Sequence, residues 1–476
     1  MGIKHYDCGP QNIHSAKRIF KLDTQNTSYI MAVVDNDNFL GHVYYGSKLK
    51  DYDVAYLLRT NEAPFVPSQN ERDRSSFMDS FPAEYPGHGV GDCRDGCIGV
   101  LSQGGHRGVN LSVVSHKIYD GKPELTGLPA TFGRQRECTT LEIECADAAL
   151  GMEVTLLYTV FENVDAVTRS VHIKNASRQD IYLTKVLSAC LDMDNKDFDR
   201  MTLHGSWARE RHIQRQKIGY GKYAVSSLRG EPGHQEHPFM ALMTEETTQD
   251  VGEVYAVHFV YSGNFIVQEE VNQFDSVRLT VGINPDDFCW KLAPEECFQA
   301  PEAVLTYSEN GIGGMTRTFH DLYRNHLIRG EYRDKKRPVL INNWEATYFD
   351  FNTDKLIAIA KQATGLGIEM LVMDDGWFGN RDSDNRALGD WQVNEEKIKG
   401  GLNFLVEEVN KLGMKFGIWF EPEMISPDSD LYRSHPDWAI AIPGRKASLA
   451  RNQLVLDLTR KEVRDYVYEC VAKILR

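Results

Sequence analysis

The chain has 476 residues and a formal net charge of −15, with 42% hydrophobic and 25% charged residues. This length predicts two to four domains, and the composition is that of a globular protein able to bury a large core without disulfides or metals. The negative charge argues against nucleic-acid binding and against anionic membranes, and it fits a protein that handles neutral substrates.

Nothing in the sequence predicts export, a membrane span or a metal site. The first eight residues lack the apolar core of a secretory signal, and no window of about 18 apolar residues follows. The nine cysteines are scattered, so we expect reduced thiols in a cytoplasmic protein. The only close pair, Cys93 and Cys97, lies near His88, Asp92 and Asp95, but no second Cys/His pair at ligand spacing follows.

The first domain is predicted to span residues 1–310 and to be built of strands. Runs rich in β-branched and aromatic residues, such as 154–160 and 254–261, are separated by turn signals such as Ser262-Gly263-Asn264. Many such runs over about 300 residues indicate a large antiparallel β-sandwich rather than a small barrel. The polar segment 61–80, punctuated by prolines, is expected to be a long excursion.

Residues 311–337 are predicted to form a helical linker, because residues 315–327 carry apolar side chains at helical spacing. From residue 338 to 476, short apolar strands alternate with helices, which is typical of a parallel sheet buried on both faces. The expected strands are 339–344, 371–375 and 416–421, and the expected helices are 354–366, 402–412 and 461–476. This alternation indicates the first three of the eight units of a (β/α)₈ TIM barrel, so the chain looks truncated.

Polar and aromatic side chains follow each of these three predicted strands. The first strand ends at Trp344, the second ends at Asp374-Asp375 and leads into Gly376-Trp377, and the third includes Trp419 and Glu421. Carboxylates accept hydrogen bonds from hydroxyl groups and indole rings cover the C–H face of a sugar, so this clustering indicates a carbohydrate site. A plain Asp-Gly turn and core tryptophans are the alternatives.

The residues alone leave a catalytic carboxylate pair unresolved. Adjacent side chains on a strand point to opposite sides, so Asp374 and Asp375 make a poor pair. Either aspartate with Glu421 is geometrically possible, since glycosidases use two carboxyl groups separated by about 5 Å or more.

Motifs over nearly the whole chain resemble bacterial α-galactosidases of glycoside hydrolase family 36. The resemblance is carried in the second half by residues 342–350, 374–379, 388–391, 421–424 and 436–438, and in the first half by residues 84–86, 121–123, 128–131, 207–211 and 261–265. It implies an N-terminal β-supersandwich followed by a catalytic (β/α)₈ barrel. It also implies retaining hydrolysis of terminal α-galactosyl groups, as in melibiose and raffinose, with no cofactor.

The resemblance places both catalytic aspartates beyond Arg476, at the fourth and near the sixth barrel strand. No catalytic residue is therefore assigned, and the 476-residue chain alone is expected to be inactive. The substrate shell does carry over. Asp374 and Asp375 are expected to bind the hydroxyls on C4 and C6 of galactose, with Trp344 and Trp419 as pocket walls. Arg451 is expected near the nucleophile and the C2 hydroxyl.

The resemblance also implies a homotetramer in which an N-terminal loop enters a neighbouring active site. Residues 73–77 resemble that loop, so Arg74 and Glu62 are expected to line the pocket of another subunit. A solvated charge in a polar loop is the alternative for Arg74.

Three other functions stay open. The first is an α-N-acetylgalactosaminidase, which differs mainly around the C2 substituent. The second is a non-catalytic galactose-binding fragment. The third is an interaction or structural protein built on the sandwich.

Overall fold

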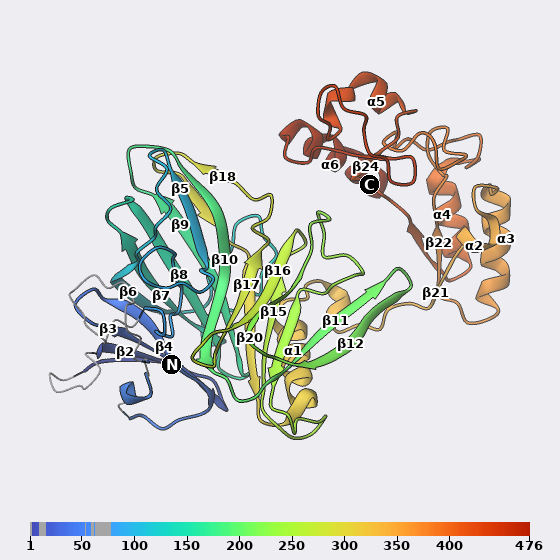
Figure 1. Cartoon of the computed structure of the whole chain (residues 1–476). Helices are drawn as coiled ribbons and strands as arrows, with labels where there is room; N and C mark the ends of the chain where they lie inside the picture. The colour runs from blue at the N-terminus through green and yellow to red at the C-terminus, as the bar shows by residue number, and fades with distance from the viewer. Residues whose placement is uncertain (1, 9–15, 53, 59–60, 62–77) are drawn as a thin grey trace. The chain divides into compact units, whose positions relative to one another are not determined.

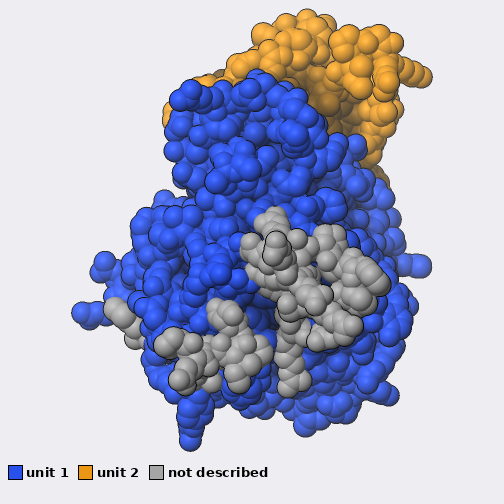
Figure 2. All heavy atoms as spheres, turned by 60° about the vertical axis from the view of Figure 1, so that its left-hand side comes forward, with its two compact units in different colours: residues 1–329 blue, residues 330–476 orange. Residues whose placement is uncertain are grey.

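The structure is a computed structural model, and it describes residues 2–8, 16–52, 54–58, 61 and 78–476. The chain divides into two compact units, Met1–Arg329 and Gly330–Arg476, which are coloured separately in Figure 2. Most of the predicted excursion at 61–80 lies outside the described residues. None of the helices described is long and apolar enough to cross a membrane.

Unit 1 consists of antiparallel sheets, labelled in Figure 1. A four-stranded meander contains β1 (Ile3–Asp7), β2 (Ala16–Asp23), β3 (Thr27–Val34) and β4 (Phe39–Ser47). A six-stranded sheet runs in the order β13-β16-β17-β10-β18, with β5 also paired to β10. Its strands are β5 (Ile98–Ser102), β10 (Ile181–Asp194), β13 (Gly221–Ser226), β16 (Phe265–Val271), β17 (Ser276–Ile283) and β18 (Trp290–Leu292).

The third sheet of unit 1 has ten strands in the order β12-β11-β14-β15-β20-β9-β8-β7-β6, with β19 also paired to β9. Its strands are β6 (Ser112–Asp120), β7 (Thr139–Asp147), β8 (Met152–Phe161), β9 (Ala166–Asn175), β11 (Asp199–Ser206), β12 (Arg209–Lys217), β14 (Phe239–Met243), β15 (Val254–Val260), β19 (Cys297–Gln299) and β20 (Glu302–Ser308). A short 3₁₀ turn, η1, spans Ala55–Leu57.

One apolar core joins the two large sheets. Leu156 and Val171 of the ten-stranded sheet belong to the same buried cluster as Leu187 and Val281 of the six-stranded sheet. Two sheets that share one core in this way form a sandwich. The predicted large β-sandwich is therefore confirmed.

Helix α1 (Gly311–His326) packs on the outer side of this sandwich. Its Met315, Phe319 and Leu322 are buried in a second apolar cluster with side chains of β14, β15 and β20, such as Val254 and Val304. The helix begins earlier than predicted because Gly311, at φ +64°, makes the turn that starts it. The helix thus lies within unit 1, and the predicted three-part division, with a linker at 311–337, stays a proposal.

Several buried charges in unit 1 are paired, and Glu84 is the first example. Glu84, fully buried, accepts hydrogen bonds from Tyr29 (2.8 Å) and Tyr158 (2.7 Å), contacts the Nδ1 atom of His42 at 2.7 Å, and pairs with the Nη1 atom of Arg169 at 3.1 Å. Burial opposes the charge of Glu84, but His42 and Arg169 outweigh that effect and lower the pKa of Glu84.

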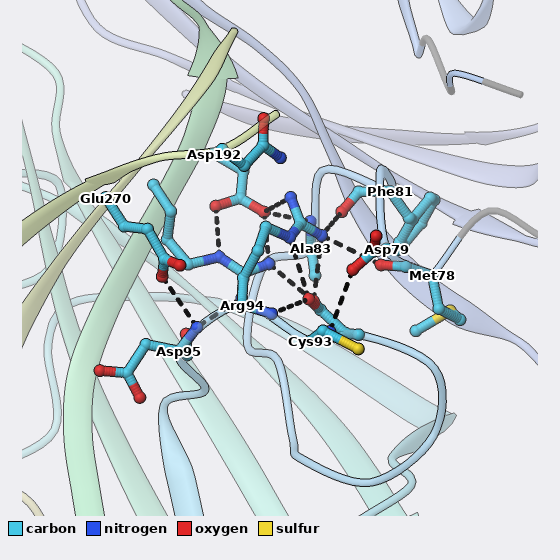
Figure 3. A network of polar contacts seen from close by, with 12 residues as sticks. Met78, Asp79, Phe81, Ala83, Cys93, Arg94, Asp95, Asp192 and Glu270 are labelled. Carbon is cyan, nitrogen blue, oxygen red and sulfur yellow. Dashed lines mark hydrogen bonds and ion pairs between the residues drawn. The ribbon is translucent and has the colours of Figure 1, made fainter. Parts of the chain in front are cut away.

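A second buried network, seen in Figure 3, binds the chain before β5 to β10 and β17. The guanidinium groups of Arg94 and Arg278 lie between the carboxylates of Asp92 and Asp192, with the Arg278 Nε to Asp192 Oδ1 distance at 2.7 Å. The backbone N–H of Ala83 also donates to Asp192, at 3.0 Å. Two positive and two negative charges thus neutralise one another inside the sandwich.

Unit 2 contains a parallel three-stranded sheet, β21 (Leu340–Asn342), β22 (Met370–Met373) and β23 (Lys415–Ile418). Its helices are α2 (Trp344–Thr347), α3 (Thr353–Thr364), α4 (Gly401–Lys411), α5 (Asp430–Ser434) and α6 (Lys461–Leu475). The antiparallel strand pair β24 (Met424–Ile425) and β25 (Leu454–Val455) and the turns η2 (Glu331–Arg333) and η3 (Pro436–Trp438) complete it. The predicted start of an α/β barrel-type domain is confirmed, although the first strand is shorter than expected and Trp344 begins α2.

The pairing of Asp95 predicts an acid-dependent loss of stability. Burial opposes its charge, but the hydrogen bond from Lys185 (2.6 Å) and the charge of that lysine outweigh burial and lower the pKa of Asp95 from 3.8 to about 2. An unfolded chain therefore takes up the proton first as pH falls. The contribution, on the order of 2 kcal/mol, is complete above the unfolded pKa and is lost as pH falls through the folded pKa.

Urea unfolding followed by circular dichroism between pH 5 and pH 2 measures this loss. Asp95→Asn should flatten the dependence of the unfolding free energy on pH across that window. Asp194→Asn removes an exposed carboxylate of the same sandwich and should keep the wild-type slope. Identical slopes in Asp95→Asn and the wild type would contradict the assignment.

Candidate functional site

The parallel register places the three strand ends of unit 2 side by side. Asn342 pairs with Val372, and Met373 pairs with Ile418, so β21, β22 and β23 end at neighbouring positions. Beyond the last paired residues, the Trp419 N–H donates to the carbonyl of Met373 at 2.8 Å. The residues that follow each strand therefore converge at one edge of the sheet, as the sequence predicted for parallel strands.

Asp374 is held in place by the neighbouring strand end. Its backbone N–H donates to the Asn343 side chain at 2.8 Å, and its Oδ2 atom accepts from the Nδ2 atom of Asn342 at 2.5 Å. Its Oδ1 atom accepts from the backbone N–H of Asp375 at 2.7 Å. Asp374 stays partly exposed, so its carboxylate is oriented and still open to a ligand.

Asp375, by contrast, is 3% exposed and forms an ion pair with Arg381, which is 2% exposed. The Nε atom of Arg381 lies 3.0 Å from Oδ1 and 3.2 Å from Oδ2 of Asp375, and its Nη2 atom lies 2.8 Å from Oδ2. The two neighbouring aspartates therefore have different surroundings, one polar and open, the other buried in an ion pair.

Two of the predicted aromatic residues flank this edge. Trp344 begins α2, where its ring meets Phe349 edge-on at 5.0 Å between centroids. Trp419 lies parallel to Phe378 at 6.4 Å and 14° between ring planes, and both side chains of this second pair lie in the apolar cluster of unit 2. Trp344 and Trp419 are half-buried, which leaves part of each ring available to a ligand.

Trp377, which the sequence suggested as a sugar-facing ring, is instead fully buried. Its Nε1–H donates to the Trp419 carbonyl at 2.9 Å, and its ring packs against Phe378 at 5.1 Å. The left-handed turn at Gly376 (φ +104°) sends the chain back into the core, so Trp377 supports the site from beneath.

Arg451 lies on an exposed loop between β24 and β25. Its Nη2 atom contacts Oδ1 of Asp384 at 3.1 Å. Glu421, after β23, is partly buried, and its Oε2 atom has no hydrogen-bond partner in the described part of the chain. Burial, the nearby charge of Glu423 and that of Asp375 raise the pKa of Glu421, against the opposing charge of Arg451.

Two basic residues at this edge were not predicted from the sequence. One is Arg381, and the other is Lys397, whose Nζ atom lies 4.2 Å from the centroid of the Phe351 ring. Burial lowers the pKa of Lys397, although the charge of Asp375 opposes that effect. Both residues lie in polar segments with no period or motif, so no local signal singled them out.

The two remaining predicted residues, Arg74 and Glu62, lie outside the described residues. The structure thus brings together Asp374, Asp375, Trp344 and Trp419, and it links Arg451 to them only through intermediate charges. Across the described ranges, no group of three or more His, Cys, Asp or Glu side chains is arranged to hold a metal ion.

Both halves of the chain match known families. Residues 38–293 match the glycosyl hydrolase family 36 N-terminal domain, and residues 297–476 match melibiase. The chain is 46% identical to α-galactosidase AgaA of Geobacillus stearothermophilus, over 96% of this chain and 63% of that protein. It is 42% identical to α-galactosidase Mel36A of Lactobacillus acidophilus, over 96% and 63%.

Solved structures agree with this match. A variant of AgaA in complex with 1-deoxygalactonojirimycin superposes with a TM-score of 0.94 at 46% identity, covering 96% of this chain and 64% of that one. Another variant of AgaA, in complex with raffinose, gives the same score and coverage. The chain thus spans a little under two thirds of the length of these relatives.

Gly376 predicts a local sensitivity to side-chain size. A Cβ atom there would lie 3.0 Å from the Phe349 ring and 3.1 Å from Lys397 Nζ, at a φ of +104°. Gly376→Ala should lower the unfolding free energy by about 1–3 kcal/mol, because strain and crowding add. Chemical denaturation followed by tryptophan fluorescence measures it.

Gly413→Ala is the matched control, because Gly413 has a φ of +78° and open space around its Cα atom. It should show only the smaller cost of the left-handed backbone. Equal losses in the two variants would contradict the crowding at Gly376.

Proposed function

This chain belongs to glycosyl hydrolase family 36, and from that premise we propose that the protein is an α-galactosidase. Its substrates are terminal α-galactosyl groups, such as those of melibiose and raffinose-type oligosaccharides, hydrolysed with retention and without a cofactor. The observation that carries the proposal is the adjacent pair Asp374 and Asp375 at the end of β22, between the aromatic side chains Trp344 and Trp419.

Asp374 and Asp375 are proposed to accept hydrogen bonds from the hydroxyls on C4 and C6 of galactose. In galactose the axial C4 hydroxyl lies on the same side of the ring as C6, so two adjacent carboxylates can reach both. A sugar with an equatorial C4 hydroxyl would leave a partly buried acceptor unpaired, and such a site rejects it strongly. The relative AgaA, a variant of which was solved with raffinose, supports this choice of sugar.

Trp344 and Trp419 are proposed as walls that cover the apolar face of the sugar ring, because each ring is only half-buried. Arg451 is proposed to approach the C2 hydroxyl. Its side chain is 60% exposed and is held by Asp384.

Double displacement needs a nucleophile and an acid/base whose carboxyl groups are about 5 Å apart. We assign neither role to the adjacent aspartates. Both oxygens of Asp375 are engaged by Arg381, and both oxygens of Asp374 accept hydrogen bonds within the site. They hold substrate, and the pair that breaks the glycosidic bond is not among the residues placed in this site.

Assembly and location are also proposals. We propose a homotetramer in which Arg74, and with it Glu62, reaches the active site of a neighbouring subunit. A cytoplasmic location fits the nine scattered cysteines, none of which forms a disulfide in the described part of the chain.

The substrate assignment predicts a large effect of Asp374. In the natural gene product that contains this chain, Asp374→Ala should lower kcat/KM for p-nitrophenyl α-galactoside on the order of 100-fold, since hydrogen bonds to charged groups contribute about 1.5–3 kcal/mol. Glu407→Ala, which changes an exposed residue of α4, should keep wild-type kinetics.

A parallel assay with the α-N-acetylgalactosaminide separates the two candidate sugars. Faster turnover of that substrate by the wild-type protein would contradict the assignment to galactose.

A further inference from the structure

We propose that Arg381 is a positioning residue for galactose recognition, which orients Asp375 directly and Arg451 through Asp384. This inference rests on the proposed function. Neither Arg381 nor Asp384 lies in the motifs that carry the family resemblance.

The contact between Arg381 and Asp375 is two-pronged. Nε and Nη2 of Arg381 face both carboxylate oxygens at 2.8–3.2 Å, and both side chains are almost completely buried. A planar guanidinium matches a carboxylate in this way, so it fixes the plane of the carboxylate as well as neutralising it. A lysine ammonium is a point charge and would leave the carboxylate free to rotate.

Arg381 is itself anchored on its other sides. Its Nη1 atom donates to the carbonyl of Arg386 at 2.9 Å, and its backbone N–H donates to the carbonyl of Phe378 at 3.1 Å. The guanidinium also lies 5.7 Å from the centroid of the Phe349 ring. Because these contacts fix the side chain of Arg381, the arginine can in turn fix the orientation of the Asp375 carboxylate.

The hydrogen bonds used by Arg381 limit what Asp375 can do. A carboxylate offers about four acceptor positions. Arg381 uses three of them, one on Oδ1 and two on Oδ2. One position on Oδ1 remains, so Asp375 can accept one sugar hydroxyl. Asp374 keeps two, one on each oxygen, because each already accepts a single hydrogen bond.

Asp384 extends the chain of charges to Arg451. Its Oδ1 atom lies 3.8 Å from Nη2 of Arg381 and 3.1 Å from Nη2 of Arg451. The charges alternate along Asp375, Arg381, Asp384 and Arg451, so each carboxylate or guanidinium is attracted to its neighbours. The exposed Arg451 is in this way tied to the buried end of β22.

Calorimetric titration of the natural gene product with galactose and its deoxy analogues tests the proposal. Arg381→Lys should weaken galactose binding on the order of tenfold. Asp375 is proposed to bind either the C4 or the C6 hydroxyl, and one of the two sugars 4-deoxygalactose and 6-deoxygalactose lacks that hydroxyl. For this sugar, Arg381→Lys should change the affinity by less than about twofold. Equal losses with all three sugars would indicate a general structural defect, and unchanged galactose affinity would mean no role; either result overturns the inference.

Asp384→Asn tests the proposed link from Asp384 to Arg451, and this test does not depend on the folding of the Arg381 variant. It should weaken galactose binding but leave the affinity for 2-deoxygalactose unchanged, because Arg451 is proposed to act at C2. A loss of equal size for both sugars, or no loss, overturns the link to Arg451.

Arg386→Lys is the matched control, since Arg386 binds Arg381 through its backbone carbonyl, while its side chain pairs with Asp382 and Asp428. Its affinities should equal those of the wild type. If the wild-type protein binds none of these sugars, the proposed function fails and the positioning role fails with it. If the wild type binds galactose and only the variants disagree with expectation, the proposed function stands alone.

Discussion

The pairing of deeply buried charges such as Glu84, Asp192 and Asp375 is the constraint on which both units depend. A carboxylate removed from water is costly unless a cation and hydrogen bonds replace the solvent. In unit 1, Glu84 meets Arg169 and Asp192 meets Arg278, and these pairs join segments more than 80 residues apart. In unit 2, Asp375 meets Arg381 only six residues away. Buried ion pairs thus join distant strands in unit 1 and fix the conformation of a single loop in unit 2.

Much of this arrangement was readable from the sequence. The apolar runs before Asp374 and Trp419 predicted parallel strands, and parallel strands bring their ends together. Periodicity alone could not show that Trp377 turns inward, since that depends on the left-handed backbone of Gly376. Nor could it find Arg381, because the direction of a side chain in an irregular loop is set by tertiary packing. Local signals therefore predicted the strand ends, and tertiary contacts decided which side chains face one another there.

Asp374 and Asp375 have different surroundings, and they are therefore proposed to play different roles in sugar recognition. A buried, paired carboxylate is rigid and has little spare capacity for hydrogen bonds, so it selects by geometry. The partly exposed carboxylate of Asp374 accepts from Asn342, while the Asp374 backbone N–H donates to Asn343; this carboxylate has more capacity and adapts to its ligand. Glu421, whose pKa is raised mainly by burial, adds a carboxyl group whose Oε2 atom has no hydrogen-bond partner among the described residues. Together these carboxyl groups offer several oxygen atoms that can accept hydrogen bonds from hydroxyl groups.

The short span between Asp375 and Arg381 has a consequence for how such a site can be transferred between proteins. One loop carries a carboxylate, its counter-charge, the Gly376 turn and the Trp377 ring that packs beneath them. A segment that contains its own neutralising partner carries both charges with it after a loop exchange, while Trp377 still requires Trp419 and Phe420 to pack against. Residues 375–381 therefore keep or lose the buried charge pair as one piece.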